Sequence, residues 1–244
     1  MSFQRGPTYN SVSEVKGPSG FYKIITSMGP IVVYIDQDYD GGGWVLALSN
    51  REYTGGMNNL KYDDAINNYN YRTGGSGQNS SNIVVTSDRV IKTLGISGVN
   101  SWLGLKFWSE LTGRKSDNKI HVTQFVSNSP VTLNATSSHN KRSSWTSTGF
   151  NSNYGFNSVG NLSNQLGGST PGMYSHASSC NSLTTYDNDQ DTNGGNCSTY
   201  YNNNPWWYSS CWTGNYFAGG GYQDRPYWVS SGGDNHAYGA VYIK

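Results

Sequence analysis

Apolar residues in the first part of the chain form short runs that are separated by turn residues. FYKIIT at 21–26, IVVYID at 31–36 and WVLALS at 44–49 are rich in aromatic and β-branched residues, with Met-Gly-Pro and Asp-Gly-Gly-Gly between them. Farther along, KIHVTQFVS at 119–127 alternates apolar and polar positions, as a half-buried strand does. The pattern predicts an opening meander of strands and a further strand near the middle of the chain.

Helical patterns are few and short. The best are YDDAINNY at 62–69 and GLKFWSELTG at 104–113, and glycines bound the second. Residues 1–19 contain two Gly-Pro pairs and show neither helical nor strand periodicity, so we predict an N-terminal arm there. Residues 20–244 then form the globular domain.

The stretch from Asn134 to Gly172 is mostly Ser, Asn, Thr and Gly, but large aromatic residues are spaced through it. A flexible linker is one interpretation. We favour structured loops and short strands, because a linker rarely contains so many large apolar side chains. The aromatic residues are Trp145, Phe150, Tyr154 and Phe156.

Composition narrows the fold class. Only 34% of the 244 residues are hydrophobic, but 19 tyrosines and 8 tryptophans supply large side chains that can fill a core. The 31 glycines and the abundant Asn and Ser indicate many turns and long loops. We therefore expect a loop-rich β or α+β protein.

Charge and hydropathy argue against several kinds of partner. The formal net charge of +1 gives no general attraction to nucleic acid or to an anionic membrane, and no Lys/Arg run occurs. No window approaches the roughly 18 apolar residues of a membrane span, and the N-terminus lacks the apolar region of a signal peptide. We expect a soluble chain with no nucleic-acid partner, no membrane insertion and, as given, no export signal.

The three cysteines are too few for a disulfide scaffold, and their spacing does not suit a zinc site. At most one intrachain bridge can form. Cys197 and Cys211 enclose a short loop that holds a Trp-Trp pair, which favours this bridge and leaves Cys180 as a thiol. Such a bridge implies that the protein meets an oxidising environment at some stage.

The segment YDNDQDTNGGNC at 186–197 places three aspartates at alternate positions. Like charges so close together repel one another unless a cation or solvent relieves them. A looping backbone can bring such carboxylates round one hard cation, with carbonyl groups completing the oxygen shell. An EF-hand does not fit, because it needs Gly at the position of Thr192 and Glu at that of Ser198. A solvated Asx-rich turn without metal is the alternative.

Together with the residues that follow, STYYNNNPWWYSSCWTGNYFAGGGY, this segment resembles the C-terminal half of a fibrinogen-like domain. That family has a D-x-D-x-D calcium loop ending in Asn-Cys, then a Trp-Trp stretch and a second Cys. SGFYKI, PIVVYIDQ and DGGGWVLALSNRE resemble the family's opening strands, and PYWVSSGGDNHAYGAVYIK resembles its closing strands. The resemblance, over residues 19–244, implies an α+β domain with an antiparallel sheet core, short helices, long loops and a calcium loop in its C-terminal half.

The resemblance also implies which residues bind Ca²⁺. Asp189 and Asp191 correspond to the side-chain ligands of the family, and Asp187 corresponds to a neighbour that is not a ligand. The backbone carbonyls of Asn193 and Gly195 complete the protein's share of the site.

The family's disulfides correspond only in part. Cys197–Cys211 is the equivalent of the bridge beside the calcium loop, where it holds the Trp-Trp segment at 206–207 in place. The family's cysteine after the Val-Tyr pair is Ile35 here, so the first family disulfide is absent and Cys180 has no obvious partner.

Aromatic residues in polar loops indicate a surface for sugar rings. The histidine that usually follows the second loop cysteine helps animal lectins of this family to bind acetyl groups, and in this chain it is Trp212. Indole faces suit the apolar faces of pyranoses, and binding residues collect in loops on a rigid scaffold. Trp206 and Trp207 are expected to pack in the core. The predicted ligand-binding residues are Tyr201, Trp212, Tyr216, Trp228 and Asp234.

Signatures of catalysis are absent, and we predict that the protein is not an enzyme. The four histidines are scattered without metal-ligand spacing, and G-x-S-x-G, P-loop and H-E-x-x-H motifs do not occur. Asp63 with Asp64, or Glu110 with another acid, could form a glycosidase pair, but the sequence does not give the separation that this chemistry requires.

Two functions fit these observations. The first is a calcium-stabilised, lectin-like carbohydrate-binding module in which Ca²⁺ orders the loops. The second is a purely structural decoration, fibre or assembly protein of a virus particle. We expect a blend, in which a virion or phage surface module recognises host-cell glycans and contacts other virion proteins or itself through residues 1–19. Its location is then extracellular or on the virion surface.

Overall fold

The computed structural model describes a large sheet, a small sheet and short helices. The described residues are 7–51, 59–67, 69–73, 99–112, 117–127, 140–158, 160–164, 182–208, 210–211, 214–215, 227–228, 234–235 and 238–244.

The large sheet has ten strands among these residues and is antiparallel except at one edge. Its strands are β1 (Thr8–Tyr9), β2 (Gly20–Thr26), β3 (Gly29–Asp36), β4 (Trp44–Arg51), β5 (Tyr69–Thr73), β6 (Val99–Leu103), β7 (Ile120–Ser127), β8 (Asn140–Ser147), β9 (Gly160–Asn164) and β13 (Tyr238–Ile243). The main path is β1-β2-β3-β4-β13-β7-β8-β9, and β6 connects β5 to β4.

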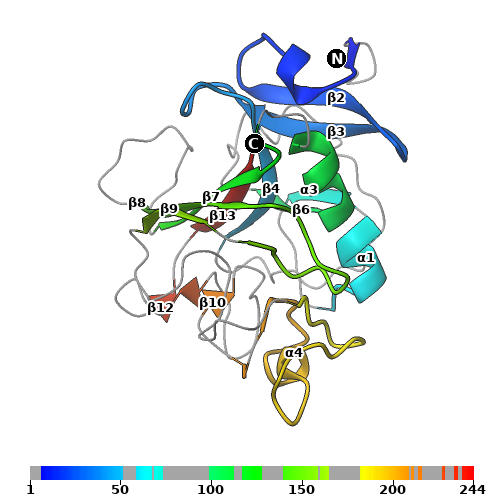
Figure 1. The fold of residues 1–244 in the computed structure, drawn as a ribbon, viewed down its shortest axis with the longest axis vertical. Helices are drawn as coiled ribbons and strands as arrows, with labels where there is room; N and C mark the ends of the chain where they lie inside the picture. Colours follow the sequence, from blue (N-terminus) through cyan, green and yellow to red (C-terminus); the bar gives the residue numbers. More distant parts are fainter. Residues whose placement is uncertain are drawn as a thin grey trace.

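The last strand of the chain lies in the middle of this sheet (Figure 1). From Tyr238 to Ile243, β13 pairs with β4 on one side and with β7 on the other. Both edges of the strand therefore have hydrogen-bond partners, and Val241 and Ile243 are fully buried. The C-terminal segment is an integral part of the core.

The predicted strands are confirmed. The runs at 21–26, 31–36 and 44–49 lie within β2, β3 and β4, and β7 occupies all but the first residue of 119–127. The predicted glycine turn lies between β3 and β4. Gly42 has a φ of +75° there, and a Cβ at this position would collide with the side chain of Gln37, so a larger residue does not fit.

The two predicted helices are also confirmed, as α1 (Tyr62–Asn67) and α3 (Leu105–Thr112). α3 buries Leu105, Phe107 and Trp108 on the face that packs toward β7 and β2. A further short helix, α4 (Cys197–Tyr200), follows the aspartate segment. None of the helices within the described ranges is long and apolar enough to span a membrane.

The described part of the predicted arm packs against the sheet. β1 pairs in parallel with β2, and a turn of 3₁₀-helix, η2, covers Val12–Glu14. Val12 and Val15 are buried in the main hydrophobic cluster, and the side-chain amide of Gln37 donates to the carbonyl of Val15 at 3.0 Å. The boundary at residue 19 stays a prediction.

Aromatic side chains fill much of the core, as the composition predicts. Trp207 is central: its ring centroid lies 5.1 Å from that of Phe156 and 6.4 Å from that of Trp108. The predicted burial of Trp206 and Trp207 is confirmed. In the Ser/Asn-rich stretch, residues 140–158 and 160–164 form β8, β9 and ordered loops, which agrees with the preference for structure over a linker.

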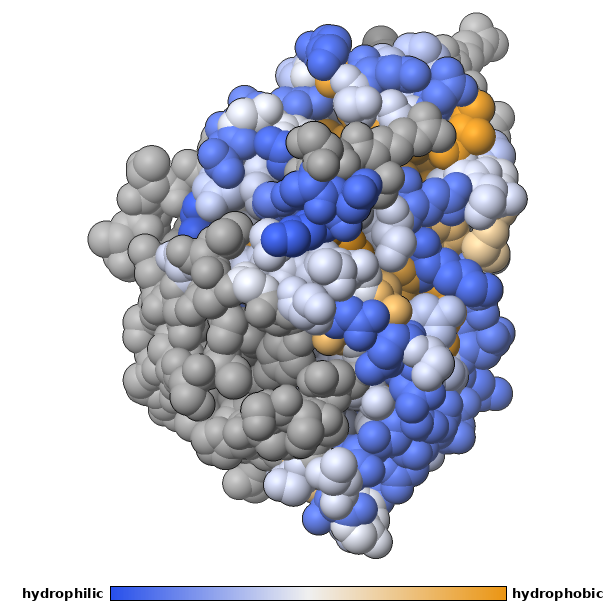
Figure 2. Space-filling view, in the orientation of Figure 1, coloured by the Kyte–Doolittle hydropathy of each residue, from blue (hydrophilic) through white to orange (hydrophobic). Residues whose placement is uncertain are grey.

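The coloured residues on the visible face of the molecule are largely hydrophilic (Figure 2). Apolar surface gathers near its upper right, in the region of β2 and β3. Three large hydrophobic side chains are exposed among the described residues, namely Ile25, Met28 and Tyr200.

Candidate functional site

The aspartate segment is anchored to the core at both of its ends. Thr184 and Trp206 exchange two backbone hydrogen bonds of 2.9 and 3.1 Å, and the N–H of Leu183 donates to the carbonyl of Asn153 at 3.1 Å. Leu183 and Trp206 are fully buried. The loop that carries the three aspartates therefore leaves and re-enters a fixed part of the structure.

Within this loop, the four predicted metal-binding residues are linked by hydrogen bonds. Oδ1 of Asp189 accepts from the N–H of Asp191 at 3.3 Å, and Oδ1 of Asp191 accepts from the N–H of Asn193 at 2.9 Å. The side-chain amide of Asn193 donates to the carbonyl oxygen of Gly195 at 3.0 Å. This chain of Asx-type contacts curls the backbone tightly and brings two carboxylates and the Gly195 carbonyl into one small region.

The electrostatic environment of Asp191 would favour a bound cation. Burial raises the pKa of Asp191 above its usual value of 3.8, and the negative charge of Asp189 raises it further. The N–H groups of Cys197 and Asn193, which donate to the carboxylate, act in the opposite direction. Two carboxylates that repel each other, together with nearby carbonyl oxygens, fit a hard cation such as Ca²⁺.

Among the described residues, no group of three or more His, Cys, Asp and Glu side chains converges as a metal site. The predicted site contains only two carboxylates and otherwise uses carbonyl oxygens, so this finding does not bear on it. Asp189, Asp191, Asn193 and Gly195 stay predicted ligands.

Asp187 has a different environment from the other two aspartates. Its Oδ1 accepts from the hydroxyl of Thr185 at 2.7 Å and from the backbone N–H of Tyr62, at the start of α1, at 3.0 Å. The carboxylate therefore links the loop to a helix in the N-terminal half of the chain. This structural role fits the expectation that Asp187 is not a ligand.

The predicted disulfide between Cys197 and Cys211 is present, with 5.0 Å between the Cα atoms. Asn196 caps α4 by accepting from the N–H of Thr199 at 3.2 Å, and Oδ2 of Asp191 accepts from the N–H of Cys197 at 2.9 Å. Helix, disulfide and aspartate loop are thus joined through adjacent residues. Cys180 lies outside the described residues.

Tyr200 is an exposed aromatic residue that sequence reasoning missed. Its side chain is 65% exposed, and a Cβ added at Gly195 would collide with its hydroxyl group. The ring therefore lies directly over the backbone of the aspartate loop. The tandem Tyr200-Tyr201 pair after the loop was an available signal, but sequence does not show which of two adjacent tyrosines faces outward.

The predicted ligand-binding residues have mixed outcomes. Tyr201 is half-buried, with its ring 6.0 Å from that of Tyr208 and at 25° to it, so part of its surface remains accessible. Trp212 and Tyr216 lie outside the described residues. Their roles, like that of Tyr201, stay predictions.

The small sheet brings the remaining candidates close together. It contains β10 (Gly214–Asn215), β11 (Tyr227–Trp228) and β12 (Asp234–Asn235), in that order. Trp228 is paired with Gly214 on one side and with Asp234 on the other. The backbone therefore places the closing-loop candidates next to the segment that begins three residues after Cys211.

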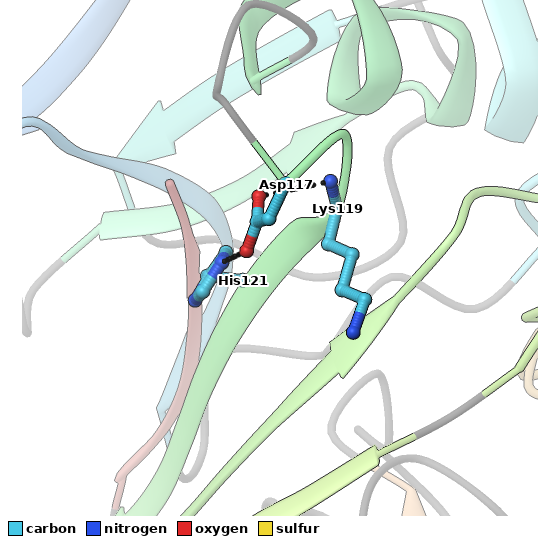
Figure 3. A network of polar contacts seen from close by, with 3 residues as sticks. All are labelled: Asp117, Lys119 and His121. Carbon is cyan, nitrogen blue, oxygen red and sulfur yellow. Dashed lines mark hydrogen bonds and ion pairs between the residues drawn. The ribbon is translucent and has the colours of Figure 1, made fainter.

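The residues considered for other chemistry have structural partners. His121 is 2.7 Å from Oδ2 of Asp117, whose other oxygen accepts from the N–H of Lys119 at 3.2 Å (Figure 3). Glu110 accepts hydrogen bonds from the backbone and hydroxyl of Ser27, and Asp63 accepts from the side chain of Asn67. The other three histidines lie outside the described residues.

A comparison with protein-family models identifies the family to which this fold belongs. The model for the C-terminal globular domain of the fibrinogen beta and gamma chains matches residues 9–237. The chain therefore belongs to this family, and the predicted fibrinogen-like α+β fold is confirmed. Ile35, which the sequence resemblance places where the family has a cysteine, is fully buried in the hydrophobic core.

Solved structures agree on the fold. The fibrinogen-like globe domain of human ANGPTL6 superposes with a TM-score of 0.60 at 19% identity, covering 100% of this chain and 98% of that one. The corresponding domain of human ANGPTL2 gives 0.56 at 17% identity, covering 97% and 98%. No curated protein sequence matches the chain.

Proposed function

We propose that this protein is a calcium-stabilised, lectin-like module whose aromatic loop surface binds saccharides. The observation that carries the proposal is the position of Tyr200, which is 65% exposed and lies over Gly195 of the aspartate loop. An exposed ring held on an anchored loop is a ready surface for the apolar face of a pyranose.

A bound Ca²⁺ would stabilise the aspartate loop, against which the ring of Tyr200 lies. Asp189 and Asp191 would hold the ion through their carboxylates, with the carbonyl groups of Asn193 and Gly195. When bound, the ion supplies positive charge that offsets the repulsion between the carboxylates and keeps the loop in one conformation. Since Gly195 lies beneath Tyr200, order in the loop fixes the ring as well. A ring that is already fixed loses less entropy when a sugar binds.

The remaining predicted contacts come from the small sheet. Trp228 and Asp234 are paired there beside Gly214, and Trp212 and Tyr216 flank β10 in the sequence. We propose that these residues extend the surface and set its specificity. Catalysis is not part of the proposal, because the sequence carries no catalytic motif.

Weak sugar binding by a single module is compatible with a function that uses many copies of the protein on one surface. We expect each module to bind sugar with a dissociation constant on the order of 0.1 to 1 mM. Useful adhesion would then need many copies, as on a virion or phage surface outside the host cell. Since Val12 and Val15 are buried within the protein, contacts with other virion proteins or between copies through the arm would use its exposed polar side chains.

The test is a glycan array probed with multivalent full-length protein in calcium and in chelator. Tyr200→Ala and Trp212→Ala should each lower binding about tenfold, which corresponds to about 1.4 kcal/mol. Met28→Ala is the matched control, because it removes another exposed apolar side chain that belongs to the β2–β3 turn. If wild-type protein binds no glycan but is found in purified particles, the purely structural function stands instead.

A further inference from the structure

A second candidate site lies at the other end of the molecule. A pocket of about 270 Å³ opens between η2, the glycine turn at 41–43 and the end of α3. Figure 1 places η2, β2 and β3 at the top of the long axis, whereas α4 and the aspartate loop lie at the bottom. The pocket is therefore separate from the proposed saccharide surface, and nothing that follows depends on that proposal.

Three consecutive glycines form one wall of the pocket. Gly41, Gly42 and Gly43 form this wall, each with a φ near +75°. Gln37 joins the wall to the arm: its amide nitrogen donates to the carbonyl of Val15 at 3.0 Å, and its amide oxygen accepts from the N–H of Gly43 at 2.9 Å. One side chain thus fixes the spacing between the two sides of the pocket.

The floor of the pocket is apolar. Val12, Ile24 and Val45 line it and are buried, and Leu111 adds a half-buried side chain from α3. Ile25, which is 48% exposed, also lines the pocket. A ligand with a hydrocarbon body would cover the apolar surface of Ile25 and Leu111 that now meets water.

The polar part of the lining carries a small excess of positive charge. The charged side chains of the lining are those of Lys16, Lys244 and one acidic residue, Glu110. The Glu110 carboxylate accepts hydrogen bonds from Ser27. The amine of Lys244 donates to the carbonyl of Asp40 at 3.0 Å, whereas Lys16 is exposed. An anionic head group would be attracted to these amines while its apolar body enters the pocket.

We propose that this pocket binds a small amphipathic carboxylate, such as a medium-chain fatty acid. The volume of about 270 Å³ matches a ligand of on the order of ten non-hydrogen atoms, since a water molecule takes about 30 Å³. The hydrocarbon chain lies against Ile25 and Leu111, above the buried floor, and the carboxylate lies toward Lys16.

The experiment is a titration of full-length protein with octanoate, followed by NMR shifts or calorimetry, with octan-1-ol as an uncharged probe of the same length. We expect saturable binding of one octanoate and weaker binding of octanol. Ile25→Glu should weaken octanoate binding by at least about tenfold, because it places a negative charge at the apolar lining. Lys16→Gln should weaken it about twofold to fivefold, as expected for an exposed charge.

Two matched variants separate the pocket from general effects. Met28→Glu adds the same charge at an exposed position that does not line the pocket, and Lys61→Gln removes an exposed lysine next to α1. Both should bind octanoate as wild type does. The proposal is overturned if octanoate shows no saturable binding, if Ile25→Glu and Lys16→Gln bind as wild type, or if Met28→Glu loses as much affinity as Ile25→Glu. All four substituted positions are outside the buried core, so melting curves should show that each variant is folded. If Ile25→Glu fails to fold, the affinity of Lys16→Gln for octanoate and that of wild type for octanol test the proposal instead.

Discussion

Asp187 accepts a hydrogen bond of 3.0 Å from the backbone N–H of Tyr62, although 125 positions separate the two residues. Tyr62 begins α1, and the first N–H groups of a helix have no partner within it. The carboxylate therefore acts as a cap supplied by a distant segment. Through this contact the aspartate loop and the N-terminal half of the chain stabilise each other.

Replacing Asp187 by alanine should destabilise the fold without affecting metal binding. Loss of a cap costs about 1 kcal/mol, which lowers the Tm of a domain of this size by about 2–4 °C. The decrease should be the same in calcium and in chelator, as measured by thermal unfolding. Asp187→Asn, which retains a side-chain oxygen, should recover most of the loss. A decrease seen only in calcium would instead make Asp187 a ligand.

Calcium should stabilise the wild-type protein measurably. An ion that binds only the folded state adds about 2.7 kcal/mol at one hundred times its dissociation constant, so a chelator should lower the Tm by several degrees. The double variant Asp189→Ala/Asp191→Ala should melt at the same temperature with and without chelator. Wild-type protein that ignores chelator and contains no metal by elemental analysis would rule out the calcium site.

Reduction of the Cys197–Cys211 bridge should cost about 3 kcal/mol, because the bridge closes a loop of about 15 residues. Thermal unfolding with and without reductant measures this loss. Cys180→Ser is the control, since we predict that Cys180 is a thiol and that this variant keeps the stability of wild type. Peptide mapping without reductant that places Cys180 in a bridge would contradict the prediction.

The stability contributed by Asp36 should depend on pH. Burial raises its pKa above 3.8, and nearby Asp38 raises it further, against the two N–H groups that donate to it. The folded state therefore holds this proton to higher pH than the unfolded chain does. Stability falls as pH rises from about 3.8 through the raised pKa, and is level beyond it.

Asp36→Asn removes this titration and retains an oxygen for the N–H groups of Asp38 and Tyr39. As pH rises from about 3.8, Asp36 should lower the Tm of wild type but not that of the variant, so the Tm of the variant relative to wild type should rise. An identical pH profile for the two proteins would show that the Asp36 carboxylate does not contribute in this way.

Local features of this protein can be predicted from its amino-acid sequence. The runs that became β2, β3 and β4 were predicted correctly, because strand-forming residues and a glycine turn act over a few positions. The Cys197–Cys211 pair follows from cysteine spacing, and the motifs at both ends of the domain carry the family resemblance. Burial of the Trp-Trp pair also followed from the family pattern.

The contacts between distant segments become known only from the folded structure. It places β13 between β4 and β7, buries Val12 and Val15 of the predicted arm, and brings Asp187 to α1. It also leaves Tyr200 exposed and packs Tyr201 against Tyr208, although the two tyrosines are identical in type and adjacent in sequence. The local sequence pattern reflects the secondary structure that a residue prefers. Its burial and its partners depend on the surfaces that pack against it, and these surfaces come from distant parts of the chain.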